Sequence, residues 1–208
     1  MFVRQLMTTD VITVAPTDTI ADTMALMREK KVNRLPVIEN GKLVGLVTDG
    51  DLREVSPSPA TTLSIFELNY LVAKTTIREI AVKHVITCGP DTRIEDAALV
   101  MRDHKIGGLP VVENGSLVGI ITESDVFGAF LNILGLRSPG DRIVVEATDK
   151  VGVMCDVATT IKEYGVNIAS LAIYHPSTEK IKILLRLNGE KVEEVEKALA
   201  AKGYILES

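Results

Sequence analysis

The sequence predicts a mixed α/β and α+β protein with two copies of a β-α-β-β-α unit followed by a ferredoxin-like βαββαβ plait. The first observation is an internal repeat. Residues 3–52 align without a gap with residues 77–126, at an offset of 74, and 21 of the 50 positions are identical. The second is the helical spacing of apolar residues within each copy. The third is a new pattern of alternating strands after residue 140. Identity in register indicates a duplicated supersecondary unit.

Each copy begins with a predicted strand and a predicted helix. A run of β-branched residues at 11–14 favours a strand. Apolar residues at i, i+4 and i+7 from Ile20 onward predict an amphipathic helix. We expect the N-cap of this helix at Asp18. In the second copy we expect it at Thr92, with Glu95 completing a capping box.

A β-hairpin is predicted next in both copies. Asn40-Gly41 lies between two apolar runs, and Asn114-Gly115 occupies the same place in the second copy. This pair is typical of a tight hairpin, because both turn residues must adopt positive φ. A unit of about 50 residues is too small to bury its own sheet well. We therefore expect the two copies to pair with each other.

The remaining segments set the domain boundaries. Ser-Pro-Ser-Pro at 56–59 indicates a loop, and a capping box at 64–67 indicates a short helix after it. Beyond residue 140, predicted strands and apolar helical stripes alternate in the order βαββαβ. The predicted boundaries are repeat one at 1–55, a linker with a short helix at 56–76, repeat two at 77–137 and the plait at 141–208.

The composition excludes several classes of function. The net charge is −5, there is no Trp, and aromatic residues make up 4%. A basic surface or a base-stacking platform for nucleic acid is therefore not expected. No apolar stretch reaches the roughly 20 residues of a membrane span. Two cysteines and three scattered histidines offer neither a disulfide framework nor a metal site. We expect a cytoplasmic protein that binds no metal, no membrane and no nucleic acid.

Thr48-x-x-Asp51, repeated as Thr122-x-x-Asp125, is the most informative motif. As a capping box, the Thr hydroxyl caps the following helix and the carboxylate reaches back to the backbone. The same residues could instead bind a ligand. A helix N-terminus attracts phosphate, and a carboxylate there can accept hydrogen bonds from two ribose hydroxyls. The two interpretations are compatible, and both stay open.

The repeated unit resembles a CBS domain, and the pair resembles a Bateman module. The similarity lies in Asn33 to Val37, in GLVTDGD at 45–51 and in GIITESD at 119–125. It implies that AMP, ADP, ATP or S-adenosylmethionine binds in the cleft between the copies as a regulatory ligand. In this family the Thr and Asp hold phosphate and ribose, which implies Thr48, Asp51, Thr122 and Asp125. In this family the strand before a proline, here Pro16 and Pro90, contacts the adenine base. The resemblance therefore implies Thr13, Val14, Thr87 and Cys88 as base contacts.

The two copies differ in their cations. The first copy has Arg34 and Arg53 where the second has Gly108 and Phe127. An acidic protein needs local cations to hold an anionic ligand. We therefore hypothesise asymmetric sites, with both arginines as ligand contacts. The arginine-bearing side would favour a phosphorylated ligand, and the other side would take a less charged ligand or none. The alternative is that these arginines are solvated surface residues.

The C-terminal plait resembles an ACT domain through Asp149 to Val153 and Gly165 to Ile168. ACT domains dimerise side by side, and many bind an amino acid at the interface. The resemblance implies Asp149, Gly152 and Asn167 as effector contacts. The alternative is that Gly152 only relieves a turn, that Asn167 only tolerates a left-handed backbone, and that the domain serves assembly alone.

The whole arrangement resembles the AcuB-like acetoin-utilisation regulators, which implies a stand-alone regulator of an unspecified pathway. The leading hypothesis is a non-catalytic sensor, for which we expect a regulated enzyme as partner. A scaffold with empty CBS sites is the alternative. An enzyme is disfavoured because no catalytic motif or catalytic cofactor site is present. Residues 126–134 form a stretch that is apolar on nearly every face. We expect it to pack at a subunit or CBS–ACT interface, and we expect a homodimer or higher homo-oligomer.

Overall fold

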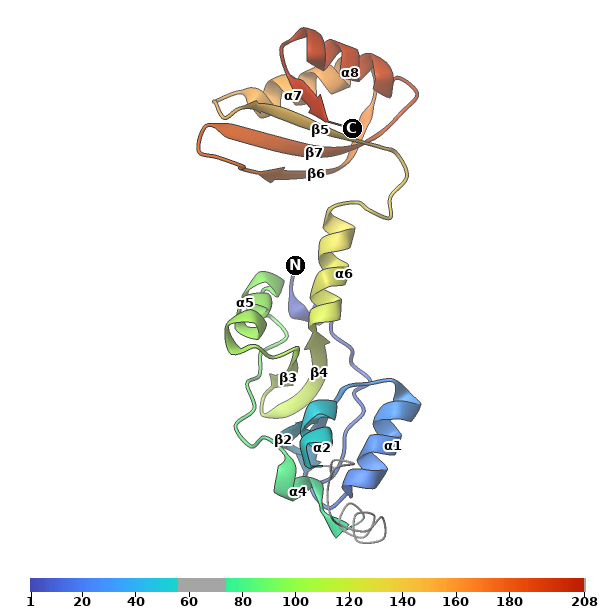
Figure 1. Ribbon diagram of the computed structural model, residues 1–208, viewed down its shortest axis with the longest axis vertical. Helices are drawn as coiled ribbons and strands as arrows, with labels where there is room; N and C mark the ends of the chain where they lie inside the picture. Colours follow the sequence, from blue (N-terminus) through green and yellow to red (C-terminus); the bar gives the residue numbers. More distant parts are fainter. Residues whose placement is uncertain (56–73, 208) are drawn as a thin grey trace, which may run out of the picture. The chain divides into compact units, whose positions relative to one another are not determined.

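The computed structural model describes residues 1–55 and 74–207 (Figure 1). The chain divides into two compact units, Met1–Val126 and Phe127–Ser208, each of which is described by itself. Most of the linker lies outside the described residues, so the short helix expected there stays a prediction.

The first unit shows the duplication in its order of elements. The first copy has η1 (Val3–Gln5), α1 (Ile20–Lys30), β1 (Arg34–Glu39), β2 (Lys42–Thr48) and α2 (Asp49–Val55). The second has α4 (Ile77–Ile80), α5 (Ile94–His104), β3 (Gly108–Glu113), β4 (Ser116–Thr122) and α6 (Glu123–Ile133), which extends into the second unit. Helices α1 and α5 and both hairpins are offset by 74 residues at each end.

The hairpins confirm the turn prediction. Asn40 and Gly41 have φ of 51° and 76°, and Asn114 and Gly115 have φ of 51° and 81°. Both hairpins are antiparallel and carry a register shift at the same place, between Val37 and Ile38 in the first copy. The predicted strand at 11–14 is reduced to one parallel bridge, from Val14 to Val37.

The predicted N-caps are wrong by one residue in each copy. Helix α1 is capped by Thr19, whose side chain accepts a hydrogen bond from the amide of Asp22, and α5 follows Arg93. The side chain of Asp18 instead accepts a hydrogen bond from the amide of Ala15 at 2.8 Å. Thr92 does the same for the amide of Gly89 at 3.1 Å. These polar residues close the turn before the helix, so they are unavailable to cap it.

The two copies interlock through their first segments. Val3 is fully buried in the core of the second copy, with Ile94 and Leu109. Ile77 is fully buried in the core of the first copy, with Ile20. Backbone bridges join Thr8 to Ile120 and Leu46 to Val82. Each copy thus completes its core with a segment of the other, which is how two small units bury enough apolar surface.

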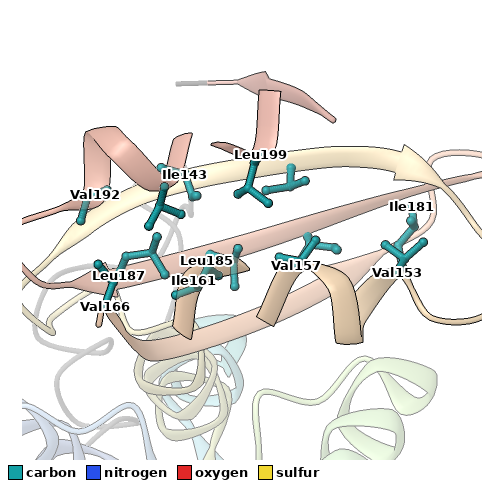
Figure 2. Packing of buried hydrophobic residues seen from close by; sticks show 13 residues of the cluster. Ile143, Val153, Val157, Ile161, Val166, Ile181, Leu185, Leu187, Val192 and Leu199 are labelled. Atoms are coloured by element: carbon teal, nitrogen blue, oxygen red, sulfur yellow. The ribbon is translucent and has the colours of Figure 1, made fainter. Parts of the chain in front are cut away.

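Beyond the end of α6, the second unit is the predicted plait. Its elements are β5 (Asp141–Thr148), α7 (Val153–Glu163), β6 (Asn167–Tyr174), β7 (Lys180–Asn188), α8 (Val192–Ala201) and β8 (Ile205–Glu207). The antiparallel sheet has the order β6-β7-β5-β8. Alternate residues of β7 are buried, and α7 and α8 pack on that face through residues such as Val157 and Leu199 (Figure 2). No described helix is long and apolar enough to cross a membrane.

Candidate functional site

The Thr-x-x-Asp motifs form capping boxes in both copies. Oδ2 of Asp51 accepts hydrogen bonds from the amide and the hydroxyl of Thr48, at 2.8 and 2.7 Å. The amide of Asp51 donates to the Thr48 hydroxyl at 3.2 Å. Thr122 and Asp125 repeat this geometry at 2.8, 2.7 and 3.4 Å. The capping interpretation is therefore confirmed. Oδ1 of each aspartate has no hydrogen-bond partner among the described residues and can still serve a ligand.

Two clefts lie beside these motifs in the first unit. We call them the Thr48 cleft and the Thr122 cleft. Their volumes are about 420 and 480 Å³, within the range typical of small-molecule sites. Thr48 and Asp51 line the first, and Thr122 and Asp125 line the second. The structure thus brings each predicted Thr-Asp pair to a cavity.

Each cleft is built from both copies. The Thr122 cleft takes its other walls from residues within 8–12 and from 31–33 of the first copy. The Thr48 cleft takes them from residues within 82–86 and from 105–107 of the second. These segments correspond at the offset of 74. The interlocked bridges of Thr8 to Ile120 and Leu46 to Val82 hold them in place. A ligand in either cleft would contact both copies at once.

The residues predicted to line the base lie elsewhere. Val14 is 5% exposed and belongs to the first copy's core, because its bridge to Val37 holds it there. Cys88 packs against the second core, and burial raises the pKa of its thiol to about 11. Neither Thr13 nor Thr87 lines these two clefts, whose apolar walls include Val11, Ile12, Val85 and Ile86 instead. A base contact by the four predicted residues stays a prediction.

Arg34 is half-buried at the junction of the two clefts and lines both. Its guanidinium lies against Gly107 and Gly108. A Cβ on Gly107 would come within 2.5 Å of Nη2. Burial lowers the pKa of the Arg34 guanidinium, and the negative charge of Glu123 opposes this shift. Because Gly107 and Gly108 of the second copy have no side chains, they leave space for Arg34 of the first copy.

Arg53 has a different position. Its side chain is 73% exposed and forms an ion pair with Asp49 at 2.7 Å, one helical turn earlier. It lines neither of the two clefts. Because Arg34 borders both clefts, its charge does not distinguish an arginine-bearing cleft from one without arginine. A ligand contact by Arg53 stays a prediction.

Sequence reasoning missed Glu123 at the start of α6 and four charged or titratable cleft residues outside the regular elements. Asp10 and Lys31 line the Thr122 cleft, and His84 and Lys105 line the Thr48 cleft. All four lie in segments between regular elements, where periodicity carries no signal. The offset of 74 does pair Asp10 with His84, so the alignment contains the difference between the clefts. No group of three His, Cys, Asp or Glu residues in the described ranges could hold a metal ion.

The predicted effector residues of the plait are not brought together within one chain. Asp149 follows the end of β5, and its Oδ2 lies 3.3 Å from Nε2 of His175. Gly152 is the N-cap of α7 with φ of 95°. Asn167 begins β6 and pairs with Asn188, which lies at the opposite end of the sheet. Their joint role in effector binding stays a prediction.

Family models decide the relationship. A CBS domain model matches residues 3–58 and 77–132, and an ACT domain model matches 142–203. The chain belongs to the CBS-domain family. It is a CBS domain pair followed by an ACT domain, as the motifs predicted.

Relatives by sequence share the CBS pair. The CBS domain-containing protein YhcV of Bacillus subtilis is 32% identical over 124 residues, covering 60% of this chain and 81% of that protein. Inosine-5′-monophosphate dehydrogenase of Korarchaeum cryptofilum is 39% identical over 119 residues, covering 57% of this chain and 22% of the enzyme. The match to the enzyme is therefore confined to a small part of it.

Solved structures show the same pair. A structure assigned to an acetoin utilization protein (AcuB) from Vibrio cholerae has a TM-score of 0.55 and 31% identity, covering 68% of this chain and 98% of that one. CBSX2 of Arabidopsis thaliana in complex with AMP has a TM-score of 0.53 and 33% identity, covering 64% of this chain and 97% of that one. The CBS pair of protein MJ0100 in complex with 5′-methylthioadenosine and S-adenosyl-L-methionine has a TM-score of 0.53 and 28% identity. The match covers 64% of this chain and 97% of that one.

Proposed function

We propose that this CBS–ACT protein is a non-catalytic sensor that binds an adenosyl ligand in the clefts of its CBS pair. The observation that carries this proposal is the pair of clefts, each combining one Thr-Asp motif with a wall from the other copy. CBS pairs similar to this one bind AMP or the S-adenosylmethionine group of compounds, which supports the ligand class.

The Thr48 cleft illustrates the expected binding. The free Oδ1 of Asp51 accepts hydrogen bonds from the two ribose hydroxyls, because a carboxylate oxygen offers two lone pairs. The adenine packs against the apolar side chains of Val85, Ile86 and Ile106. The 5′ substituent then extends toward Arg34. The Thr122 cleft offers the equivalent groups from the opposite copies.

Ligand binding becomes a signal because each cleft has walls from two copies. A ligand that binds one arrangement of the copies more tightly shifts the population toward it. Only this difference in affinity, and not the affinity itself, can drive such a shift. The readout would be a contact with a regulated enzyme partner.

The ACT domain has the assembly role in this proposal. We infer a homodimer or higher homo-oligomer, in which an amino-acid effector could also bind at the ACT interface. Asp149 and Asn167 lie at opposite ends of one sheet. A site that uses both would therefore need a second chain.

A scaffold with empty clefts is the second candidate. It is favoured by the capping boxes, because they give Thr48, Asp51, Thr122 and Asp125 a structural role without any ligand. Isothermal titration with AMP, ATP and S-adenosylmethionine separates the candidates, with chromatography of the ligand after incubation. Binding without turnover is the expected result. No heat from any of the three compounds would favour the scaffold, and consumption of the ligand would favour an enzyme.

A further inference from the structure

The two clefts differ in charge although they share one fold. The Thr122 cleft is lined by three carboxylates, Asp10, Glu123 and Asp125, and by the cations Lys31 and Arg34. The Thr48 cleft is lined by one carboxylate, Asp51, by the cations Lys105 and Arg34, and by His84. Both clefts therefore have Arg34 and one equivalent lysine, and they differ in the number of carboxylates.

Glu123 creates part of this difference. Its equivalent in the first copy, Asp49, does not line the Thr48 cleft and is neutralised by Arg53 at 2.7 Å. The second copy has the apolar Phe127 in place of Arg53, so Glu123 lacks this partner. Glu123 acts electrostatically on Arg34 instead. The shared guanidinium is thus partly neutralised on the Thr122 side.

The remaining charge difference between the two clefts comes from Asp10 and its repeat equivalent, His84. Asp10 and His84 are equivalent in the repeat, and both are exposed at the rim of a cleft. A carboxylate at this position repels an anion, whereas an imidazole can donate a hydrogen bond to one.

We propose that the two clefts select adenosyl ligands of different charge. The Thr48 cleft takes a 5′-phosphorylated adenosine. The Thr122 cleft takes an adenosine whose 5′ substituent is neutral or cationic, such as a thioether or a sulfonium. This inference rests on the proposed function. The protein would then compare two pools of adenosyl compounds, with one cleft for each.

Lys31 and Lys105 do not reverse this assignment. Both follow a helix as its left-handed C-cap and occupy equivalent positions, so they contribute equally to the two clefts. Arg34 also borders both. A phosphate in the Thr122 cleft would gain the same cations as in the Thr48 cleft, but it would lie among two additional carboxylates.

Two probes that differ mainly in charge test the proposal. AMP and 5′-methylthioadenosine share the adenosine group and differ at the 5′ position. Isothermal titration would be performed on the full chain and on Asp51→Asn and Asp125→Asn, which are matched by the repeat. We expect Asp51→Asn to weaken AMP binding by about tenfold and 5′-methylthioadenosine by less than about twofold. We expect Asp125→Asn to show the opposite pattern.

A second pair of variants leaves the capping boxes intact. His84→Asp should weaken AMP binding by about tenfold, and Asp10→His should create a second AMP site. AMP binding to both clefts with equal affinity in the unsubstituted protein would overturn the inference, as would equal losses of AMP binding in Asp51→Asn and Asp125→Asn. In those cases the proposed function survives. If neither probe binds the unsubstituted protein, and ATP and S-adenosylmethionine do not bind it either, the proposed function fails as well.

Discussion

The guanidinium of Arg34 lies so close to Gly107 that a Cβ at that glycine would come within 2.5 Å of Nη2. The side chain belongs to the first copy and the glycine to the second, so the contact crosses the junction between them. An arginine at position 108, the repeat equivalent of Arg34, would put a second guanidinium in the same space. The pair of clefts therefore has one central cation, and its position depends on a residue without a side chain.

Gly107→Ala is expected to displace Arg34 without unfolding the protein. The added methyl meets only the end of a flexible side chain, and Gly107 does not have positive φ. AMP affinity should fall by about fivefold to tenfold, the size expected for one charge-assisted hydrogen bond, with the melting temperature nearly unchanged.

Gly108→Ala is the matched control for this variant. Its Cβ would meet Nη1 of Arg34 as well, and it would also come within 2.9 Å of the carbonyl oxygen of Ile121, which is part of the hairpin backbone. This variant should lower the melting temperature clearly, because backbone cannot move aside cheaply. An AMP affinity of Gly107→Ala equal to that of the unsubstituted protein would contradict the role given to this contact.

Thr122→Ala is expected to cost about 1 kcal/mol of unfolding free energy in the ligand-free protein. The substitution removes the hydroxyl that donates to Asp125 and accepts from its amide. Thr122→Ser retains the hydroxyl and should recover most of the loss. Urea unfolding followed by circular dichroism measures both. A Thr122→Ser variant as unstable as Thr122→Ala would show that the methyl group, and not the capping box, matters.

Asp156 is expected to make the plait acid-sensitive. Its carboxylate accepts hydrogen bonds from Lys202 at 2.8 Å and from Tyr204 at 2.7 Å, and these hydrogen bonds lower its pKa below the ordinary 3.8. A carboxyl with a lowered folded-state pKa stabilises the protein above the unfolded value, and this stabilisation is lost as the pH falls through the folded-state pKa. Burial and the bond to Asp156 raise the pKa of Tyr204 to about 12.

Asp156→Asn should therefore flatten the decline of stability below pH 3.8. Three of the four tyrosines lie in the second unit, so tyrosine fluorescence follows its unfolding. Lys202→Met removes the hydrogen bond that lowers the pKa of Asp156 most, and it should flatten the same region of the pH profile. Parallel profiles for Asp156→Asn and the unsubstituted protein would contradict the assignment.

Phe130→Asp tests the apolar surface of α6. Phe127, Phe130 and Ile133 are 64%, 55% and 50% exposed in the single chain. The predicted packing of this stretch at a subunit or CBS–ACT interface would cover these side chains, and the mass in solution tests the subunit interface. We expect Phe130→Asp to halve the mass in light scattering, with Asn132→Asp on the same helix as a control that leaves it unchanged. An unchanged mass for Phe130→Asp would remove this helix from the interface.

The local patterns of the sequence predicted most of the fold. Asn40-Gly41 determined the hairpin, because few other pairs tolerate two positive φ values. The alternation in β7 and the helical stripes of the plait gave the order βαββαβ. The N-cap of α1 was misplaced because Asp18 and Thr19 are both good capping residues, and only the competing bond to Ala15 decides between them.

The composition of the clefts was much less predictable. Thr48 and Asp51 were found because their spacing is itself a signal. Asp10 and His84 were missed because their role appears only when the first segment of each copy packs on the other, as Val3 and Ile77 do. A repeat predicts that two copies pair, but it does not predict that they exchange segments.

The most direct test of the central claim is a crystal structure of the full chain grown with saturating AMP. The account predicts electron density for AMP in the Thr48 cleft, with its ribose on Asp51 and its phosphate beside Arg34. Density for AMP on the ACT domain alone, with both CBS clefts empty, would contradict it.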